Sequence, residues 1–424
     1  MFTNHTSISG RWSLLQKFVF QFFFVYTIIY FLPLVTSMVW PKLIAWAGLY
    51  FYNEEVAEHV SGSGDTLFDM YHFIIALILA LGIAIFWIIL DRKRRSYNTL
   101  LYWQATFLRY YLCYYLLVYG LVKVIKLQFS HPMLSMLLLP LGNKSPMGLA
   151  WTFMGASDTY TIFSGVCEVL AGCFLLYRKT RTLGGIMAFG VMLNVFLMNM
   201  SYDIPVKIFS FNLMVLGLFF VLLDSKRLIN VFILNKPSES LPNQHPFKKK
   251  WANISIQVLK GILIILVFTS MISDNLERQK NYGDASPKPA MYGIYEMNDF
   301  VMNNDTLAPS VLDSVRWRYL VLEKGNGAKI FHMNSKSYLD LEHYTTEVDT
   351  NAHEITLLKY KDSIPRAILN YEKLDSTHYA FEGFYRNKQD IKDSIKLKTT
   401  RTDESDFLLM NRGFHWVNEY PYNR

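Results

Sequence analysis

The sequence predicts an α-helical, polytopic membrane bundle of about seven spans, followed by a C-terminal all-β, barrel-like domain. This domain could be a lipocalin-like barrel. Three observations predict this class. The chain of 424 residues is 52% hydrophobic and has a mean hydropathy of +0.17, which is too apolar for an ordinary soluble protein. Its long apolar runs end near residue 273. The remainder carries strand-like segments at short intervals. We therefore expect a membrane domain (1–274), a linker (275–290) and a β domain (291–424).

A helix that crosses a bilayer needs about 20 mostly apolar residues. By this measure the predicted spans are residues 18–39, 70–90, 106–125, 161–177, 183–200, 206–223 and 252–272. Pro33 is expected to be a tolerated kink in the first span. An acidic loop is expected from Pro41 to Asp69. The apolar piece 133–141, bounded by Pro132 and Pro140, is too short to cross and is predicted to be an interfacial or re-entrant element.

Basic residues lie at alternate ends of these spans. They occur at Arg11 and Lys17 and in the runs DRKRR (91–95), RKTR (178–181), DSKR (224–227) and KKK (248–250). The positive-inside rule then predicts a cytoplasmic N-terminus in the cell inner (cytoplasmic) membrane, and an odd number of spans predicts a periplasmic or otherwise extracytoplasmic C-terminal domain. The first apolar run is long enough for an uncleaved span rather than a signal peptide. Because the net charge of +8 is located at span ends, nucleic-acid binding is not predicted.

The C-terminal part contains a hairpin pattern, in which residues 316–323 and 328–333 flank a Gly-Asn-Gly turn. Further strands are predicted at 337–348, 354–360, 367–374, 378–385, 394–400 and 406–418. About eight antiparallel strands at even spacing favour an up-and-down barrel or a sandwich. The aromatic residues of 412–424 are expected to form a strand that plugs a barrel end, with a ligand site as the alternative.

Several function classes lack their motifs. The three cysteines, Cys113, Cys167 and Cys173, all lie in predicted spans and form no C-x-x-C pair, so the sequence supports neither a disulfide framework nor a zinc site. No H-E-x-x-H, G-x-S-x-G, Walker A or G-x-G-x-x-G pattern occurs. Metal-dependent, hydrolase, ATPase and nucleotide-binding functions are therefore not predicted, and no catalytic residue can be assigned.

Charged and amide side chains inside the predicted spans are the candidate ligand-binding residues, since such groups are costly in lipid unless they are paired or functional. Arg109 and Lys123 are about four turns apart and share a helix face. The full set of candidates is Arg109, Lys123, Glu168, Asn199, Asp203 and Lys207. A cavity open to the outside, lined by Lys123, Glu168, Asp203 and Lys207, is geometrically plausible.

Structural interpretations stand beside this one. Glu168 could form an ion pair that only fixes helix packing, with Lys123 as its best partner by depth. Asp203 could be a helix N-cap with Pro205 in the first turn. Lys207 could extend to the interface, and Asn199 could bridge two helices by hydrogen bonds.

The pattern Gly120-x-x-Lys123 at the end of one span, followed by Glu168-V-L-A-Gly172 and Thr180-Arg181-T-L-Gly184 in the next, resembles the DoxX-like family of small four-span bacterial membrane proteins. The resemblance covers about residues 107–223. By this resemblance, Lys123 and Glu168 are the family positions, and some members of the wider group are membrane subunits of quinone-linked oxidoreductases. A second similarity is to the helical domain of vitamin K-dependent carboxylase-like proteins, which also pair a helical bundle with a β-rich domain.

Three function hypotheses follow. The first is an auxiliary or partner-binding component of the cell envelope, whose bundle holds a lipid-like ligand and whose β domain binds a partner protein or lipid. The alternative is a quinone-binding membrane subunit of an oxidoreductase system, in which Lys123 would hydrogen-bond a quinone carbonyl and Glu168 would relay a proton. A transporter is the third, supported by the outward cavity alone.

Overall fold

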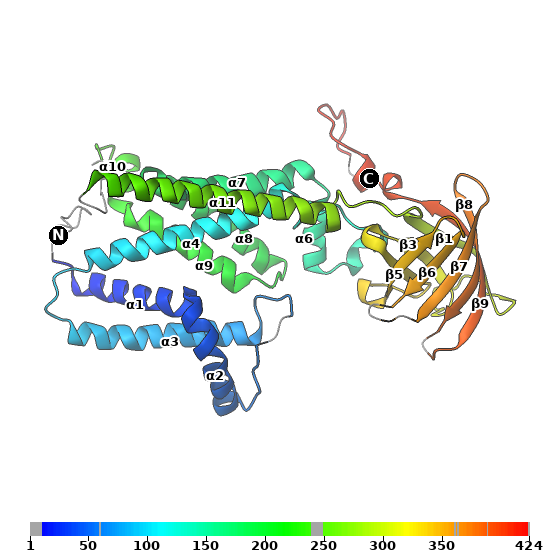
Figure 1. The fold of residues 1–424 in the computed structure, drawn as a ribbon, viewed down its shortest axis with the longest axis horizontal. Coiled ribbons are helices and arrows are strands. Elements are labelled where there is room, and N and C mark those ends of the chain that lie inside the picture. The colour runs from blue at the N-terminus through cyan, green and yellow to red at the C-terminus, as the bar shows by residue number, and fades with distance from the viewer. Residues whose placement is uncertain are drawn as a thin grey trace. The chain divides into compact units, whose positions relative to one another are not determined.

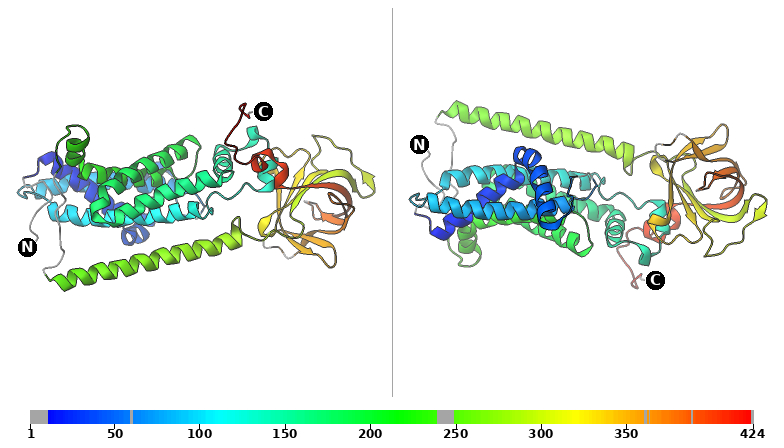
Figure 2. Two further views of the ribbon diagram at one scale, coloured as in Figure 1. Left: turned by 90° about the horizontal axis from the view of Figure 1, so that it is seen from above. Right: turned by 90° about the horizontal axis from the view of Figure 1, so that it is seen from below.

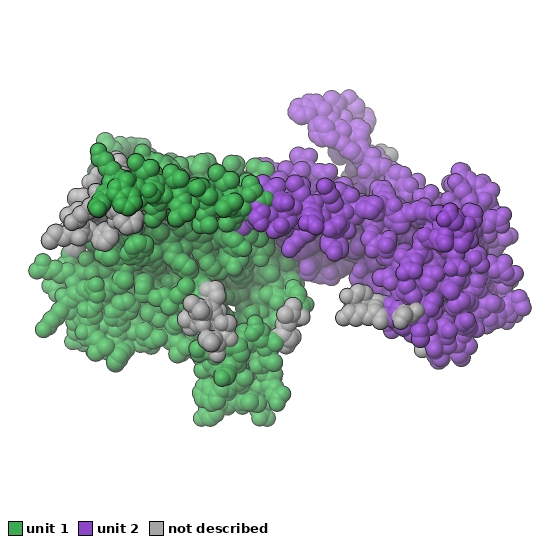
Figure 3. Space-filling model, viewed as in Figure 1, with its two compact units in different colours: residues 1–121, 164–269 green, residues 122–163, 270–424 purple. Residues whose placement is uncertain are grey.

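The computed structural model describes residues 11–58, 61–238, 249–359, 362, 364–387 and 389–422, and it divides the chain into two compact units (Figures 1 and 3). Unit 1 contains residues 1–121 and 164–269, and unit 2 contains residues 122–163 and 270–424. This division differs from the predicted domains, because the segment 122–163 between two predicted spans belongs with the β domain. The predicted linker 275–290 is helical as far as Tyr282.

The described residues form helices of widely different length. They are α1 (Leu14–Phe31), α2 (Pro33–Tyr52), α3 (Leu67–Leu90), α4 (Asn98–Val124), α5 (Leu134–Leu138), α6 (Pro146–Gly155), α7 (Asp158–Leu176), α8 (Arg181–Ser201), α9 (Lys207–Leu223), α10 (Ser225–Phe232), α11 (Lys250–Tyr282) and α12 (Leu408–Asn411). Within the described residues, six helices are long and apolar enough to cross a membrane, and a seventh span results if α9 and α10, bent by 67°, count as one. The predicted helical membrane bundle is confirmed.

The first predicted span, 18–39, is wrong as a single kinked helix. α1 ends at Phe31, Leu32 is extended (φ −89°, ψ 113°), and Pro33 begins α2. The proline ring disfavours helical backbone at the preceding residue, and proline suits the first turn of a new helix. Figure 1 shows α2 crossing the direction of α1 at a steep angle. Because α2 continues to Tyr52, the first part of the predicted acidic loop is helical.

α3 packs against α1 through small side chains. Ala76, Ala80 and Ala84 are fully buried at a four-residue spacing, which places them on one face of the helix. Small residues allow the close backbone approach that is typical of membrane helix pairs. The helix begins at a capping box in which the Thr66 and Asp69 side chains each accept a backbone N–H of the other.

Unit 2 contains a closed eight-stranded antiparallel β-barrel, which confirms the predicted barrel-like domain. Its strands are β1 (Gly293–Met302), β3 (Trp317–Leu322), β4 (Gly327–His332), β5 (Glu342–Asp349), β6 (Glu354–Leu358), β7 (Pro365–Lys373), β8 (His378–Arg386) and β9 (Lys392–Thr402), and β2 (Asp305–Thr306) pairs with the end of β1. In the described part of the chain β1 pairs with β3, the strands from β3 to β9 pair in sequence order, and β9 pairs with β1 to close the barrel.

The barrel interior is filled by side chains that alternate along the strands. Tyr295, Leu320, Ile330 and Leu369 are fully buried in one cluster inside the barrel, as expected for inward positions of period two. The predicted hairpin is correct: β3 and β4 flank a turn in which Gly325 has φ 67°, a left-handed conformation that favours glycine.

One strand was missed and one predicted strand is wrong. β1 carries a bulge between Met297 and Asp299, and this irregularity interrupts the period-two pattern by which strands are recognised. The predicted strand 406–418 forms the short helix α12 and irregular backbone instead. Since β1 and β9 already pair with each other, the barrel leaves no free edge for it. The interpretation of residues 412–424 as a plug is also wrong, because their aromatic side chains are exposed.

The short apolar piece 133–141 packs on the outside of the barrel, and its place at a membrane interface stays a prediction. Leu134 and Leu139 share a buried cluster with Ile294, Val321 and Phe331. These barrel residues are the outward neighbours of inward-facing ones, so they form the outer wall. The apolar side chains of α5 therefore find their partner in the β domain.

Polar contacts attach the same segment to the barrel. Glu323 at the end of β3 accepts hydrogen bonds from the backbone N–H groups of Leu134 (3.2 Å) and Ser135 (3.0 Å), which caps α5. Lys329 donates to the Ser135 hydroxyl (2.8 Å) and lies 3.4 Å from a Glu323 oxygen.

A second attachment involves the residues after α11. The backbone N–H of His131 donates to the Asp284 carboxylate (2.9 Å), and the Lys126 ammonium lies 3.7 Å from it. Lys324 donates to the Asp284 carbonyl oxygen (2.9 Å). These contacts explain why residues 122–163 belong to unit 2.

Candidate binding site

Four of the predicted ligand residues are buried in helices, and three of them lie in α4 and α7. Arg109 and Lys123 in α4 are 9% and 6% exposed, and Glu168 in α7 is 2% exposed. The Arg109 guanidinium donates to the Tyr110 hydroxyl (3.0 Å) and lies over that ring. Lys123 falls in unit 2 and Glu168 in unit 1. Their role as a ligand pair stays a prediction, as does quinone binding beside them.

The glycines of the DoxX-like pattern have a packing role. A Cβ on Gly120 would meet the Gly165 carbonyl oxygen and the Val169 nitrogen at 2.9 Å, and one on Gly172 would meet the Cys113 carbonyl oxygen at 3.3 Å. The backbones of α4 and α7 therefore approach closely at these two points, as small residues allow.

Asn199 connects two helices. Its side-chain amide in α8 donates to the Ser210 hydroxyl in α9 at 3.0 Å, and both residues are buried. For Asn199 the sequence allowed either a ligand-binding role or a hydrogen bond between two helices, and this contact is such a hydrogen bond. The adjoining α8 and α9 are also close at Gly217, where a Cβ would meet the Phe189 nitrogen at 2.7 Å.

Asp203 and Lys207 lie together, but the N-cap prediction for Asp203 is wrong. Their side chains form an ion pair of 2.8 Å in which Asp203 is 86% exposed. The cap of α9 comes from Asp65, whose carboxylate accepts the backbone N–H groups of Lys207 (2.7 Å) and Ile208 (2.9 Å). Asp203 itself has a left-handed backbone (φ 50°) three residues before the cap position Val206. Sequence reasoning did not single out Asp65, because it precedes α9 by 142 positions.

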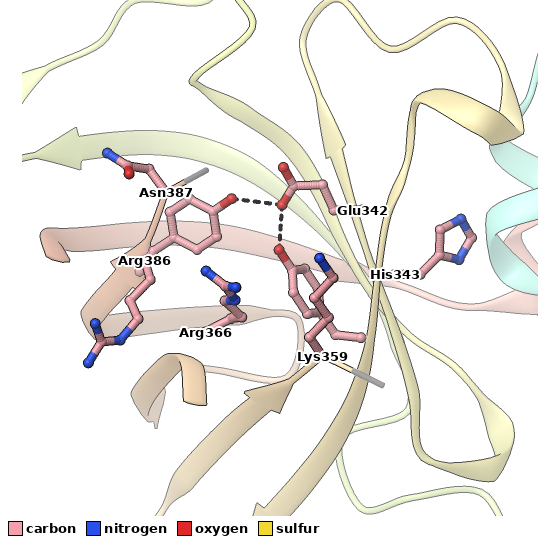
Figure 4. Close-up of a pocket in the computed structure, with 8 residues that line it drawn as sticks. Glu342, His343, Lys359, Arg366, Arg386 and Asn387 are labelled. Atoms are coloured by element: carbon pink, nitrogen blue, oxygen red, sulfur yellow. Dashed lines mark hydrogen bonds between the residues drawn. The ribbon is translucent and has the colours of Figure 1, made fainter. Parts of the chain in front are cut away.

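A cavity of about 370 Å³ opens at one end of the barrel (Figure 4). Its walls come from strand ends, and the lining residues are Glu342, His343, Tyr344, Lys359, Arg366, Tyr385, Arg386 and Asn387. β5 and β7 begin here and β6 and β8 end here, so the cavity is at the barrel end opposite the start of β1, where the chain arrives from α11. The volume is in the range of small-molecule sites.

A buried carboxylate organises the cavity wall. Glu342 Oε2 accepts hydrogen bonds from the hydroxyl groups of Tyr344 (2.6 Å) and Tyr385 (2.7 Å), shown as dashed lines in Figure 4. Its Oε1 lies 3.3 Å from His332 Nε2, and His332 Nδ1 faces the Val315 carbonyl oxygen at 3.2 Å. Burial raises the pKa of Glu342, but the hydrogen bonds from His332, Tyr344 and Tyr385 outweigh burial and lower the pKa to about 2.

Cationic side chains line the same cavity. Lys359, Arg366 and Arg386 line the cavity against one carboxylate, Glu342. Arg366 and Arg386 share Asp390 at 3.2 and 3.7 Å, whereas Arg386 Nε is buried with no hydrogen-bond partner among the described residues. Arg366 also lies 3.9 Å from Asp362. Three cationic side chains and one carboxylate therefore line the cavity, and two of the cations are also paired with carboxylates outside the lining.

The pKa values of Glu342 and its two tyrosine partners are shifted away from neutral pH. A general acid or base works best with a pKa near the operating pH. Burial and the Glu342 carboxylate instead raise the pKa values of Tyr344 and Tyr385 above their usual range, while the pKa of Glu342 is low. In the part of the chain that the structure describes, no group of three or more His, Cys, Asp or Glu side chains is placed to hold a metal ion.

Sequence reasoning missed this cavity, although one signal pointed to it. In β5 the inward positions are Glu342, Tyr344, Thr346 and Val348, so a carboxylate occupies a position that a barrel normally fills with apolar side chains. Recognising it requires the register of β5. His332, Lys359 and Arg366 come from three other strands or strand ends, and their convergence depends on the closed barrel.

Comparisons with known proteins give one match. No family model matches the chain, and no solved structure matches it. Over 128 residues the chain is 34% identical to the uncharacterized protein YwoB of Bacillus subtilis (strain 168), and the aligned region covers 30% of this chain and 80% of YwoB.

Proposed function

We propose that the chain, which belongs to the same family as the uncharacterized protein YwoB of Bacillus subtilis (strain 168), is a DoxX-like multi-pass membrane protein of the cell envelope and presents a ligand-binding β-barrel outside the cytoplasm. In this proposal the helical unit is an auxiliary anchor, and the barrel cavity receives a small anionic ligand or an acidic group of a partner protein. The DoxX-like assignment rests on the pattern at Gly120, Lys123, Glu168 and Gly172.

The side of the barrel is proposed from the distribution of charge. The basic runs at 91–95, 178–181 and 224–227 follow α3, α7 and α9, and the positive-inside rule assigns these ends to the cytoplasm. With seven spans, α11 then leaves the membrane on the opposite face. The barrel follows α11 and would therefore be extracytoplasmic.

Impermeant thiol labelling tests this topology. In a chain whose three cysteines are replaced by serine, Asp305→Cys, at an exposed position of the barrel, should react with a membrane-impermeant maleimide added to intact cells. Lys93→Cys, in the basic run after α3, should react only after the cells are opened. Labelling of position 93 but not 305 in intact cells would reverse the proposed orientation.

The observation that carries the proposed ligand class is the cationic cavity. Lys359 and Arg366 point toward the Glu342 and tyrosine cluster in Figure 4, whereas His343 points away from it. An anion in the cavity would accept charge-assisted hydrogen bonds from Lys359 and Arg366. Because the cavity is at the barrel end opposite the arrival of α11, a ligand would enter from the aqueous phase rather than from the bilayer.

Binding to the purified full chain tests the ligand class. We expect phosphate or benzoate, used as inorganic and organic probes, to bind in native mass spectrometry and calorimetry. The pair Lys359→Ala/Arg366→Ala should lower the affinity by about 10-fold or more, since a hydrogen bond to a charged group contributes about 1.5–3 kcal/mol.

The matched control changes the same charge elsewhere on the barrel. Lys396→Ala/Lys398→Ala removes two lysines of β9 whose side chains are 59% and 67% exposed, and it should leave the affinity unchanged. An equal loss in both variants would indicate non-specific charge attraction. Absence of both probes and of any co-purifying anion from the unaltered protein would reject the proposed ligand class.

A further inference from the structure

The chain ends in an exposed aromatic loop that the barrel does not use. After β9 and α12, the side chains of Phe414, Trp416, Val417 and Tyr420 are 83%, 89%, 69% and 82% exposed. Figure 2 shows this C-terminal segment projecting from unit 2. The rings of Phe414 and Trp416 are in contact, with their centroids 5.9 Å apart. Among the described residues, the other ring contact of this loop is that of Arg412 with Tyr422. Large apolar side chains that cluster in water usually mark an interaction site.

The loop has a defined shape. Gly413 has φ 63°, which turns the chain after α12. Arg412 Nη2 donates to the Asn418 side-chain oxygen (2.9 Å), and the guanidinium lies 4.8 Å from the centre of the Tyr422 ring. These contacts join the two ends of the loop, so that Phe414 and Trp416 are at its tip. Within residues 412–422 the sequence has one arginine, Arg412, and one glutamate, Glu419, and the tip of the loop consists mainly of aromatic side chains.

The loop starts on the face of unit 2 that holds the segment between two spans. Phe407, immediately before α12, packs against the cluster that contains Leu134 and Leu139 of the α5 segment. That segment connects α4, which ends at Val124, with α7, which begins at Asp158, and both helices are candidate membrane spans. Phe407 therefore packs on the chain segment that joins two candidate spans.

The same segment carries a second group of exposed rings. Phe153 of α6 and Tyr160 and Phe163 of α7 are 63%, 46% and 60% exposed, and their rings are in contact at 5.6 and 6.4 Å. They lie where a candidate span begins. Tryptophan and tyrosine are enriched at membrane interfaces because their rings are apolar at one end and polar at the other.

From these observations we propose that the C-terminal loop is an interfacial membrane anchor, in which Phe414, Trp416 and Tyr420 insert into the headgroup region of the membrane that the helices cross. The lipid surface is the partner, and the balanced charge of the loop makes insertion independent of anionic lipid. The anchor would hold the base of the barrel to the bilayer beside the inter-span segment. This proposal does not depend on which side of the membrane the barrel occupies.

The test uses the full chain in phosphatidylcholine nanodiscs. In the cysteine-free background, Trp416→Cys carries an environment-sensitive fluorophore, and Asp305→Cys at the far end of the barrel is the control. Both positions are exposed, so neither change threatens folding. We expect the fluorophore at 416 to shift to shorter wavelength and to lose about half of its emission or more to a lipid with a nitroxide near the headgroup, since interfacial segments lie about 5–10 Å deep. The fluorophore at 305 should change little.

Two results would overturn the proposal. A fluorophore at 416 that is as water-exposed as the one at 305 means that the loop does not insert. A fluorophore that is shielded but not quenched by the nitroxide lipid means that a protein surface, such as a second copy of the chain, covers the loop. Replacing Phe414 and Tyr420 by serine in the Trp416→Cys chain should abolish the lipid quenching if insertion is cooperative across the rings.

Discussion

Replacing Glu323 by alanine is expected to release the α5 segment from the barrel. Glu323 and Lys329 have side chains that are only 6% and 8% exposed. The change removes the acceptor of two backbone N–H groups of α5 and leaves the Lys329 ammonium buried without its counter-charge. Breaking a buried ion pair from one side costs about 3–5 kcal/mol. Hydrogen exchange at the amides of Leu134 and Ser135 should accelerate by about 100-fold or more.

A matched control variant tests whether the expected effect comes from the burial of the ion pair or from ion pairing alone. Glu382 and Lys396 form an ion pair of 2.7 Å on the barrel surface with side chains 66% and 59% exposed, and Glu382→Ala should change stability by no more than about 0.5 kcal/mol. Adding Lys329→Met to Glu323→Ala should restore part of the protection, because it removes the orphaned charge. Unchanged exchange at Leu134 and Ser135 in Glu323→Ala would contradict the assigned contact.

Replacing Gly120 by leucine is expected to separate α4 from α7. A side chain at this position meets backbone atoms of Gly165 and Val169 at 2.9 Å, and these cannot move aside as a flexible side chain could. Overpacking of this kind costs up to about 3 kcal/mol. The melting temperature of the protein in detergent should fall. Cys113, which is 2% exposed on α4, should become reactive toward a small maleimide in a chain with Cys167 and Cys173 replaced by serine.

Gly190→Leu is the matched control for this prediction. Gly190 is also a glycine within a candidate span, but a Cβ there would meet nothing within 4 Å. Its replacement should leave both the melting temperature and the reactivity of Cys113 close to those of the parent chain. If the two leucine variants behaved alike, the close approach of α4 and α7 at Gly120 would be refuted.

The features that were predicted correctly are those that depend on the pattern of neighbouring residues in the sequence. Apolar runs of sufficient length identified the spans because each stretch of helix must satisfy its own backbone and present apolar side chains to lipid. Alternation identified β3 to β9 in the same way, and the Gly-Asn-Gly turn located the β3–β4 hairpin. The local pattern also misled: residues 406–418 contain apolar and aromatic residues typical of a strand but form none, and the bulge of β1 interrupts the alternation by which a strand is recognised. The predicted number of eight barrel strands was correct, but the prediction included residues 406–418 and left out β1.

The candidate site residues were likewise predictable from the sequence only in part. The charged residues of the spans could be picked out by their cost in lipid, but their partners could not. The sequence by itself determined a helical membrane bundle joined to a β-barrel, since helix and strand periodicity are properties of neighbouring residues. Only the tertiary structure decided that Asp65 caps α9, that Glu323 caps α5, and that Glu342 meets cations from separate strands. These contacts join residues far apart in the chain, and they form only once the barrel has closed and the helices have packed.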